Sequence, residues 1–170
     1  MFYSGFSLHK EEVLFEGIYD SSEFCVCGFS YGAILAFKKV LKTTTRVDKL
    51  QLISPAFFQN KDNTFKSLQL KSYLKNEDLY TKRFLKNISS PSNIDMTIYY
   101  KEPKANDLSE LLNFIFLEDD LKYIQNKGIK IEVYLGEKDK IIDVDFARDF
   151  FIDFATIFYV KDVGHILKGE

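Results

Sequence analysis

The segment Gly28-Phe29-Ser30-Tyr31-Gly32 constrains the fold of this chain more than any other feature. It follows the apolar run 24–27, which is typical of a strand buried on both faces of a parallel sheet. It precedes a stripe of apolar residues at helical spacing, Ala33, Ile34, Phe37, Val40 and Leu41. A serine on a sharp strand-to-helix turn needs neighbours with almost no side chain, and Gly28 and Gly32 meet that need. The pattern predicts Ser30 as a nucleophile; a structural glycine-rich turn is the alternative.

A nucleophilic serine needs a general base, and the chain has only two histidines. His165 follows the apolar segment 156–160, which we expect to be the last strand, and it is preceded by Gly164. His9 lies near the start of an expected helix around 10–16, where we interpret it as a surface or pocket-rim residue. The position of His165 therefore predicts it as the base.

The third member of such a triad is an acid that orients the histidine. Asp139 lies in the loop that leaves the expected strand 129–135, where a triad acid belongs. Asp143 is an alternative, although its position suits the N-cap of the helix that follows. Asp119 and Asp120 are a further alternative, but they belong to an apparently helical segment. We predict Asp139 as the acid.

Ester hydrolysis also requires hydrogen-bond donors for the oxyanion of the tetrahedral intermediate. The backbone N–H of Tyr31 comes with the turn at Ser30. The second donor is expected after a neighbouring strand, and the segment 1–4 followed by Gly5 predicts the N–H of Phe6. An ordinary strand-to-helix turn at that place is the alternative.

These motifs resemble those of the α/β-hydrolases over nearly the whole chain. More narrowly, Tyr3-Ser4-Gly5-Phe6, the Gly-Phe-Ser-Tyr-Gly segment and the terminal Gly164-His165 resemble the compact pimeloyl-[acyl-carrier protein] methyl ester esterases of biotin biosynthesis. The resemblance implies a serine esterase that releases methanol from a carrier-bound methyl ester, with no metal or organic cofactor. Larger members have His-Gly before the oxyanion residue, whereas this chain has Ser4-Gly5.

The resemblance also implies a reduced α/β-hydrolase fold in one domain, residues 1–170, because only 22 residues separate Gly5 from Gly28. Losing strands from one edge of the family's sheet leaves about five, mostly parallel. We expect them at 1–4, 24–27, 50–53, 129–135 and 156–160. A helical cap insertion is expected at approximately 57–125, with helices near 64–74, 77–86 and 108–125. Its apolar residues could line an acyl channel or build a small core: Phe57, Phe58, Phe65, Leu68, Leu79, Phe84, Phe114 and Phe116.

Charge is unevenly distributed along the chain. The whole chain has a formal charge of −2, but residues 38–86 contain twelve Lys and Arg against four Asp and Glu. Such a surface could bind nucleic acid, anionic lipid or an acidic protein, or could simply be solvated. No nucleic-acid motif supports the first possibility, and the hydrolase resemblance favours an acidic acyl carrier protein. The expected contacts are Lys71, Lys75, Lys82, Arg83 and Lys86.

Two further features bear on the compartment. No apolar run approaches the 18 to 20 residues or so of a membrane span, and the N-terminus lacks the features of a signal peptide, so we expect a cytoplasmic protein without a membrane partner. Cys25 and Cys27 are expected to be buried free thiols, since two ligands without a nearby histidine are too few for a metal site. Two functions compete with the methyl esterase: a general carboxylesterase or thioesterase, and a catalytically silent binding module.

Overall fold

A five-stranded parallel sheet forms the centre of the computed structural model, which describes residues 1–104 and 106–170. The strands lie in the order of the sequence, and each pairs in parallel with the next. They are β1 (Phe2–Tyr3), β2 (Cys25–Phe29), β3 (Lys49–Ile53), β4 (Lys130–Gly136) and β5 (Thr156–Val160). The expected α/β architecture with a five-stranded sheet is confirmed, and the strand ends differ from expectation by no more than two residues.

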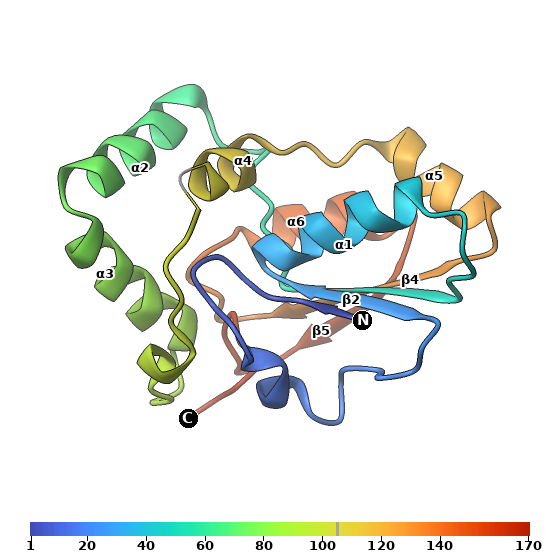
Figure 1. Ribbon diagram of the computed structural model, residues 1–170, viewed down its shortest axis with the longest axis horizontal. Helices are drawn as coiled ribbons and strands as arrows, with labels where there is room; N and C mark the ends of the chain where they lie inside the picture. The colour runs from blue at the N-terminus through green and yellow to red at the C-terminus, as the bar shows by residue number, and fades with distance from the viewer. Residues whose placement is uncertain (105) are drawn as a thin grey trace.

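Helices cover the sheet because its strands are apolar on both faces. On one face lie α1 (Tyr31–Lys42), α5 (Glu118–Asn126) and α6 (Val144–Phe151), as Figure 1 shows. The opposite face is covered in part by η1 (Glu11–Phe15), a 3₁₀ helix where the sequence suggested a helix at 10–16. Each face of the sheet has its own hydrophobic core, and alternate residues of β2 point into one or the other. Val26 packs with α1, whereas Cys25 and Cys27 pack with η1.

The segment between β3 and β4 begins with helices that lie to one side of the sheet (Figure 1). They are α2 (Asn63–Lys75), α3 (Glu77–Ser89), η2 (Met96–Tyr99) and α4 (Asp107–Asn113). Side chains cap the first two: Asp62 accepts a hydrogen bond from the N–H of Phe65, and Asn76 accepts one from the N–H of Leu79. Within the described residues, no helix is both long and apolar enough to cross a bilayer.

The prediction of a single helix at 108–125 is wrong, because the chain forms α4 and α5 with an extended stretch between them. Phe116 lies in this stretch and is buried against Phe37, Phe57 and Phe151. Its backbone is paired with the side chain of Gln59, which accepts from the Phe116 N–H at 2.8 Å and donates to its carbonyl at 3.4 Å. The burial of this ring and the Gln59 contacts therefore replace helical hydrogen bonds in this stretch. The next helix, α5, begins after it and packs beside α1.

Candidate active site

The turn after β2 holds Ser30 in a strained conformation, with φ of 53° and ψ of −116°. Its N–H donates to the carbonyl of Ile53, and its own carbonyl accepts from the N–H groups of Ala33 and Ala56. A Cβ atom at Gly28 would collide with the backbone carbonyl of Gly32, and one at Gly32 would collide with the carbonyl of Tyr3. Both glycines are therefore required by the close approach of backbone to backbone.

His165 is brought to the same edge of the sheet as Ser30, because parallel strands all end there. The Nδ1 atom of His165 lies 2.6 Å from Oδ2 of Asp139, and both side chains are fully buried. The other oxygen of Asp139 accepts hydrogen bonds from the N–H groups of Ile141 and Ile142. Since a carboxylate only accepts hydrogen bonds, Nδ1 is the donor in this contact, which makes Nε2 the acceptor in a neutral imidazole.

None of the three alternative acids makes a hydrogen bond to His165 in the described part of the chain, although Asp143 lines the same cavity as Ser30. Asp143 caps α6 by accepting from the N–H of Phe146 at 3.2 Å, and it also contacts Asn60 and Lys61. Asp119 belongs to the first turn of α5, where its side chain is 97% exposed, and Asp120 is in the same turn. The structure therefore places Asp139, and none of these three, beside His165.

The backbone around His165 is fixed by two further contacts. The hydroxyl of Ser54, at the end of β3, donates to the His165 carbonyl at 2.6 Å and is completely buried. Gly164 packs so tightly against the carbonyl of Ser90, after α3, that a Cβ atom would overlap it. The imidazole itself packs on the ring of Phe29, with centroids 5.1 Å apart. The histidine loop is thus attached to β2, to β3 and to the end of α3.

The Nε2 atom of His165 is buried and, within the part of the chain that the structure describes, has no hydrogen-bond partner. Ser30 likewise makes no side-chain hydrogen bond to any described residue, although it lines the cavity that Asp139 also lines. A buried nitrogen without a partner typically costs about 1–3 kcal/mol. Catalytic hydrogen bonds are often absent or long before substrate binds, so the missing partner of Nε2 is compatible with the predicted role of His165 as the base.

Two backbone N–H groups are the oxyanion donors expected from the sequence. That of Tyr31 opens α1, and that of Phe6 belongs to the loop after β1. Neither donates a hydrogen bond to a described residue, and the side chain of Phe6 lines the cavity together with Ser30. The use of these two N–H groups as oxyanion donors stays a prediction.

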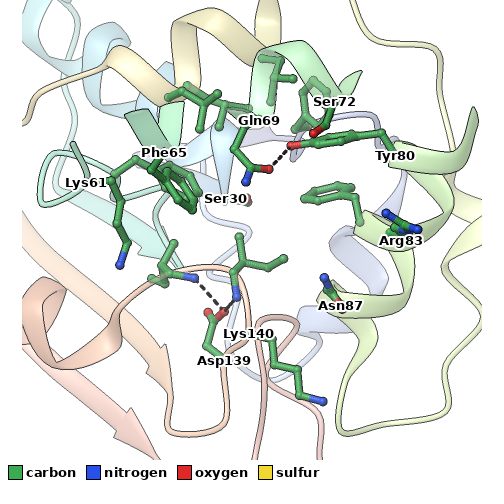
Figure 2. Close-up of a pocket in the computed structure, with 18 of the residues that line it drawn as sticks. Ser30, Lys61, Phe65, Gln69, Ser72, Tyr80, Arg83, Asn87, Asp139 and Lys140 are labelled. Carbon is green, nitrogen blue, oxygen red and sulfur yellow. Dashed lines mark hydrogen bonds between the residues drawn. The ribbon is translucent and has the colours of Figure 1, made fainter. Parts of the chain in front are cut away.

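The cavity has a volume of about 620 Å³ and lies between the sheet edge and α2, α3 and α4 (Figure 2). Helices α2 and α3 contribute both apolar and polar side chains to it: Gln69 and Tyr80 are hydrogen-bonded at 3.0 Å, and Arg83 and Asn87 also line the cavity. The apolar lining residues include Phe6, Phe58, Phe65, Phe84, Leu108, Leu111, Leu112 and Ile142. A volume of this size suits a small or medium-sized organic ligand.

Comparisons with solved structures decide what this architecture is. An esterase from Exiguobacterium antarcticum matches with a TM-score of 0.64 at 18% identity, over 82% of this chain and 58% of that one. A naproxen esterase from Bacillus subtilis matches with a TM-score of 0.56 at 18% identity, over 91% and 57%. BioG from Haemophilus influenzae matches with a TM-score of 0.58 at 12% identity, over 97% and 87%. This chain has the α/β-hydrolase fold.

The hydrolase fold is present here in a short form. The chain spans little more than half the length of the two esterases, but most of the length of BioG. No protein-family model matches the sequence, and no curated protein matches it significantly. At identities this low the likeness concerns the fold alone, so the chemistry of the site has to be argued from its own residues.

Within this hydrolase fold, the predicted cap residues divide into several groups. Phe58, Phe65 and Phe84 line the cavity, whereas Phe57, Phe114 and Phe116 pack in the core beside α1 and α6. Leu68 and Leu79 are exposed. The five expected carrier contacts are all exposed on α2 and α3, and Arg83 also lines the cavity. His9 is half-buried, and its Nδ1 lies 3.1 Å from the carbonyl of Tyr99.

Sequence reasoning missed two polar residues that support this site. Ser54 follows β3, so the rule that parallel strands end at one edge could have identified it. Glu11 is completely buried and accepts a hydrogen bond from the N–H of Gly5 at 2.7 Å. Glu11 gave no signal, because Lys10-Glu11-Glu12 has the composition of a solvated helix start.

Proposed function

We propose that this chain is a serine esterase in which Ser30 is the nucleophile, His165 the general base and Asp139 the residue that orients the base. The observation that carries the proposal is the buried pair of Asp139 and His165 at the edge of the sheet that holds Ser30 on its strained turn. The orphaned Nε2 atom of His165 supports it, because a proton from serine would satisfy this nitrogen.

The mechanism starts with the substrate carbonyl between Ser30 and the N–H groups of Phe6 and Tyr31. As Oγ of Ser30 attacks the carbonyl carbon, His165 accepts the hydroxyl proton and the negative charge on the carbonyl oxygen is stabilised by the two N–H groups. The imidazolium then donates that proton to the leaving alkoxide, and an acyl-enzyme forms. Water, deprotonated by the same histidine, then attacks the acyl carbon. The bond between that carbon and Oγ breaks, the imidazolium returns its proton to Oγ of Ser30, and the acid is released.

For the substrate we propose the methyl ester of pimeloyl-[acyl-carrier protein], with methanol as the leaving group. The motif resemblance at Tyr3–Phe6 and around Ser30 supports this choice, and so does a cavity whose lining combines many apolar side chains with polar ones from α2 and α3. The exposed cations on α2 and α3 would receive an acidic acyl carrier protein, and these helices with α4 would serve as the cap of the domain. The buried thiols of Cys25 and Cys27 are free, which suits a reducing, cytoplasmic setting.

A general carboxylesterase or thioesterase is the second candidate. It is favoured by the position of Lys71, Lys75, Lys82 and Lys86, which are exposed but do not line the cavity. A free small ester would need none of these cations.

Two experiments test the proposal in order. A fluorophosphonate probe followed by peptide mass spectrometry should label Ser30, and Ser30→Ala should abolish labelling; an unlabelled Ser30 in folded protein would leave a silent binding module. Next, the wild-type chain should restore growth without biotin to a bacterial strain that lacks its pimeloyl methyl ester esterase, while Ser30→Ala should not. Labelling without rescue, together with hydrolysis of p-nitrophenyl butyrate, would favour the general esterase.

A further inference from the structure

Glu11 is an ionisable residue in a buried position, where a charge is unfavourable for the stability of the fold. It is the first residue of η1, and its side chain is completely buried, whereas its neighbours Lys10 and Glu12 are exposed and half-buried. Among the described residues it forms no ion pair, and its Oε2 atom has no hydrogen-bond partner. Burying a carboxyl group with an unsatisfied oxygen lowers the free energy of unfolding. We therefore expect a functional role for this side chain in the contact that it does make.

Glu11 accepts a hydrogen bond from the loop expected to supply an oxyanion donor. The N–H of Gly5 donates to Oε1 of Glu11 at 2.7 Å, and the contact is buried. The carbonyl of Gly5 is fixed as well, since it accepts from the N–H of Leu8 at 3.2 Å. Glu11 and Leu8 therefore hold Gly5 at its two polar ends.

Fixing Gly5 also sets the direction of the next N–H group. In a trans peptide, the carbonyl of one residue and the N–H of the next point in opposite directions from a common plane. Because the Gly5 carbonyl turns toward Leu8, the N–H of Phe6 points away from Leu8, and it donates to no described residue. Glycine alone would leave this peptide free to rotate.

The protonation state of Glu11 does not decide this contact. Burial raises the pKa of Glu11 above that of an ordinary glutamate, and the hydrogen bond from Gly5 opposes the increase. Oε1 can accept from Gly5 whether Oε2 carries a proton or not. An amide oxygen could do the same, which predicts that glutamine can replace Glu11.

We propose that Glu11 is a positioning residue that holds Gly5 so that the N–H of Phe6 faces the oxyanion. The inference rests on the proposed esterase function for its catalytic consequence, but the Glu11–Gly5 contact can be measured without catalysis. Glu11 itself touches no reacting atom.

The test compares Glu11→Gln, which keeps the acceptor, with Glu11→Met, which keeps the approximate shape and removes it. On p-nitrophenyl butyrate we expect Glu11→Gln to stay within about threefold of wild type. Glu11→Met should lose on the order of 10²-fold in kcat with little change in KM, since a misdirected oxyanion donor acts on the transition state. Its affinity for an alkyl trifluoromethyl ketone, which forms a tetrahedral adduct on serine, should fall in parallel.

Leu14→Ala is the matched control. Leu14 is buried in the same helix as Glu11, but its apolar side chain cannot accept a hydrogen bond from Gly5. The Leu14→Ala substitution should lower the melting temperature without the decrease in kcat that we expect for Glu11→Met. Equal losses of kcat in Glu11→Met and Leu14→Ala at equal melting temperature would overturn the proposal, as would a Glu11→Gln variant as slow as Glu11→Met.

Hydrogen exchange at the Gly5 amide, followed by NMR, separates this inference from the proposed function. The amide should be protected in wild type and in Glu11→Gln and should exchange at least tenfold faster in Glu11→Met. Unchanged protection in Glu11→Met would overturn the positioning role even in an active esterase. A wild-type protein that neither reacts at Ser30 nor hydrolyses esters would instead refute the proposed function and, with it, the oxyanion role.

Discussion

Oδ2 of Asp139 lies 2.6 Å from Nδ1 of His165, and neither side chain has any exposed surface. Two N–H groups from the loop after β4 bind the second oxygen of the carboxylate, so its orientation is fixed independently of the histidine. Hydrogen bonds to a charged group are worth about 1.5–3 kcal/mol each. These contacts fix the position of the imidazole that we propose as the general base.

Substituting each aspartate by asparagine tests whether Asp139 or Asp143 orients the imidazole of His165. Asp139→Asn should lower kcat on the order of 10³- to 10⁴-fold, because an amide can favour the wrong imidazole tautomer. Asp143→Asn should leave kcat nearly unchanged, since asparagine caps a helix about as well as aspartate. Steady-state kinetics on p-nitrophenyl butyrate measures both. The reverse order of effects would make Asp143 the orienting acid.

Removal of the nucleophile and the base should be strongly non-additive. Ser30→Ala and His165→Ala should each lower kcat by several orders of magnitude, and the double variant should be hardly slower than either, because the two groups act in the same step. Circular dichroism should show intact folds. Multiplicative losses in the double variant would mean that the two residues act independently.

The side chain of Tyr31 should connect the nucleophile turn to α4. Its hydroxyl donates to Glu110 at 2.9 Å, and Lys38 binds the other oxygen of the same carboxylate at 2.6 Å. Burial, with the adjacent Glu110, raises the pKa of Tyr31, so the phenol stays protonated and donates. Tyr31→Phe should cost about 1 kcal/mol in the free energy of unfolding.

A double-mutant cycle with Glu110→Gln measures the coupling between Tyr31 and Glu110. Urea unfolding should give a coupling energy of at least about 0.5 kcal/mol. Strictly additive effects would show that the hydrogen bond contributes nothing to the attachment of α4.

The cysteines should resist thiol reagents at neutral and mildly alkaline pH. Burial raises the pKa of the Cys25 thiol to about 11 and shifts that of Cys27 still further upward. Relative to a thiol of pKa 9, a pKa of about 11 leaves roughly a hundredfold less thiolate at pH 8. Titration with Ellman's reagent should therefore detect neither thiol in native protein and both in guanidinium chloride. Fast reaction of native protein would show that β2 is accessible.

Carrier binding should depend on the cations of α2 and α3. Changing Lys75, Lys82 and Lys86 together to Glu should slow hydrolysis of the carrier-linked methyl ester at least tenfold and leave p-nitrophenyl acetate unaffected. The residues are exposed, so salt should mimic the defect, given a Debye length of about 8 Å at physiological ionic strength. Arg83 is left unchanged because it lines the cavity.

The matched control reverses three cations at the other end of the sheet, Lys39, Lys42 and Lys130, which lie in the last turns of α1 and at the start of β4. It changes the net charge equally and should affect neither substrate. Equal slowing in both triple variants would indicate a general charge effect, and no slowing in either would favour the general esterase.

The sequence by itself determined the elements whose patterns are local. The strand, turn and helix around Ser30 could be predicted because glycine is needed at positions 28 and 32 to avoid backbone collisions. Short apolar runs indicated strands such as 24–27, 129–135 and 156–160, and the hydrolase resemblance implied the five-stranded sheet. The ends of these strands then predicted that Asp139 and His165 would lie at the edge that carries Ser30.

Only the tertiary structure decided which polar groups are buried and what each one binds. The break between α4 and α5 depends on Gln59 reaching Phe116 across 57 residues of chain. Glu11 looks like a solvated charge until η1 packs against the sheet and places its carboxyl group against Gly5. Such contacts leave no periodic pattern in the sequence, since the burial of a single side chain depends on elements that are distant along the chain and adjacent only in the fold.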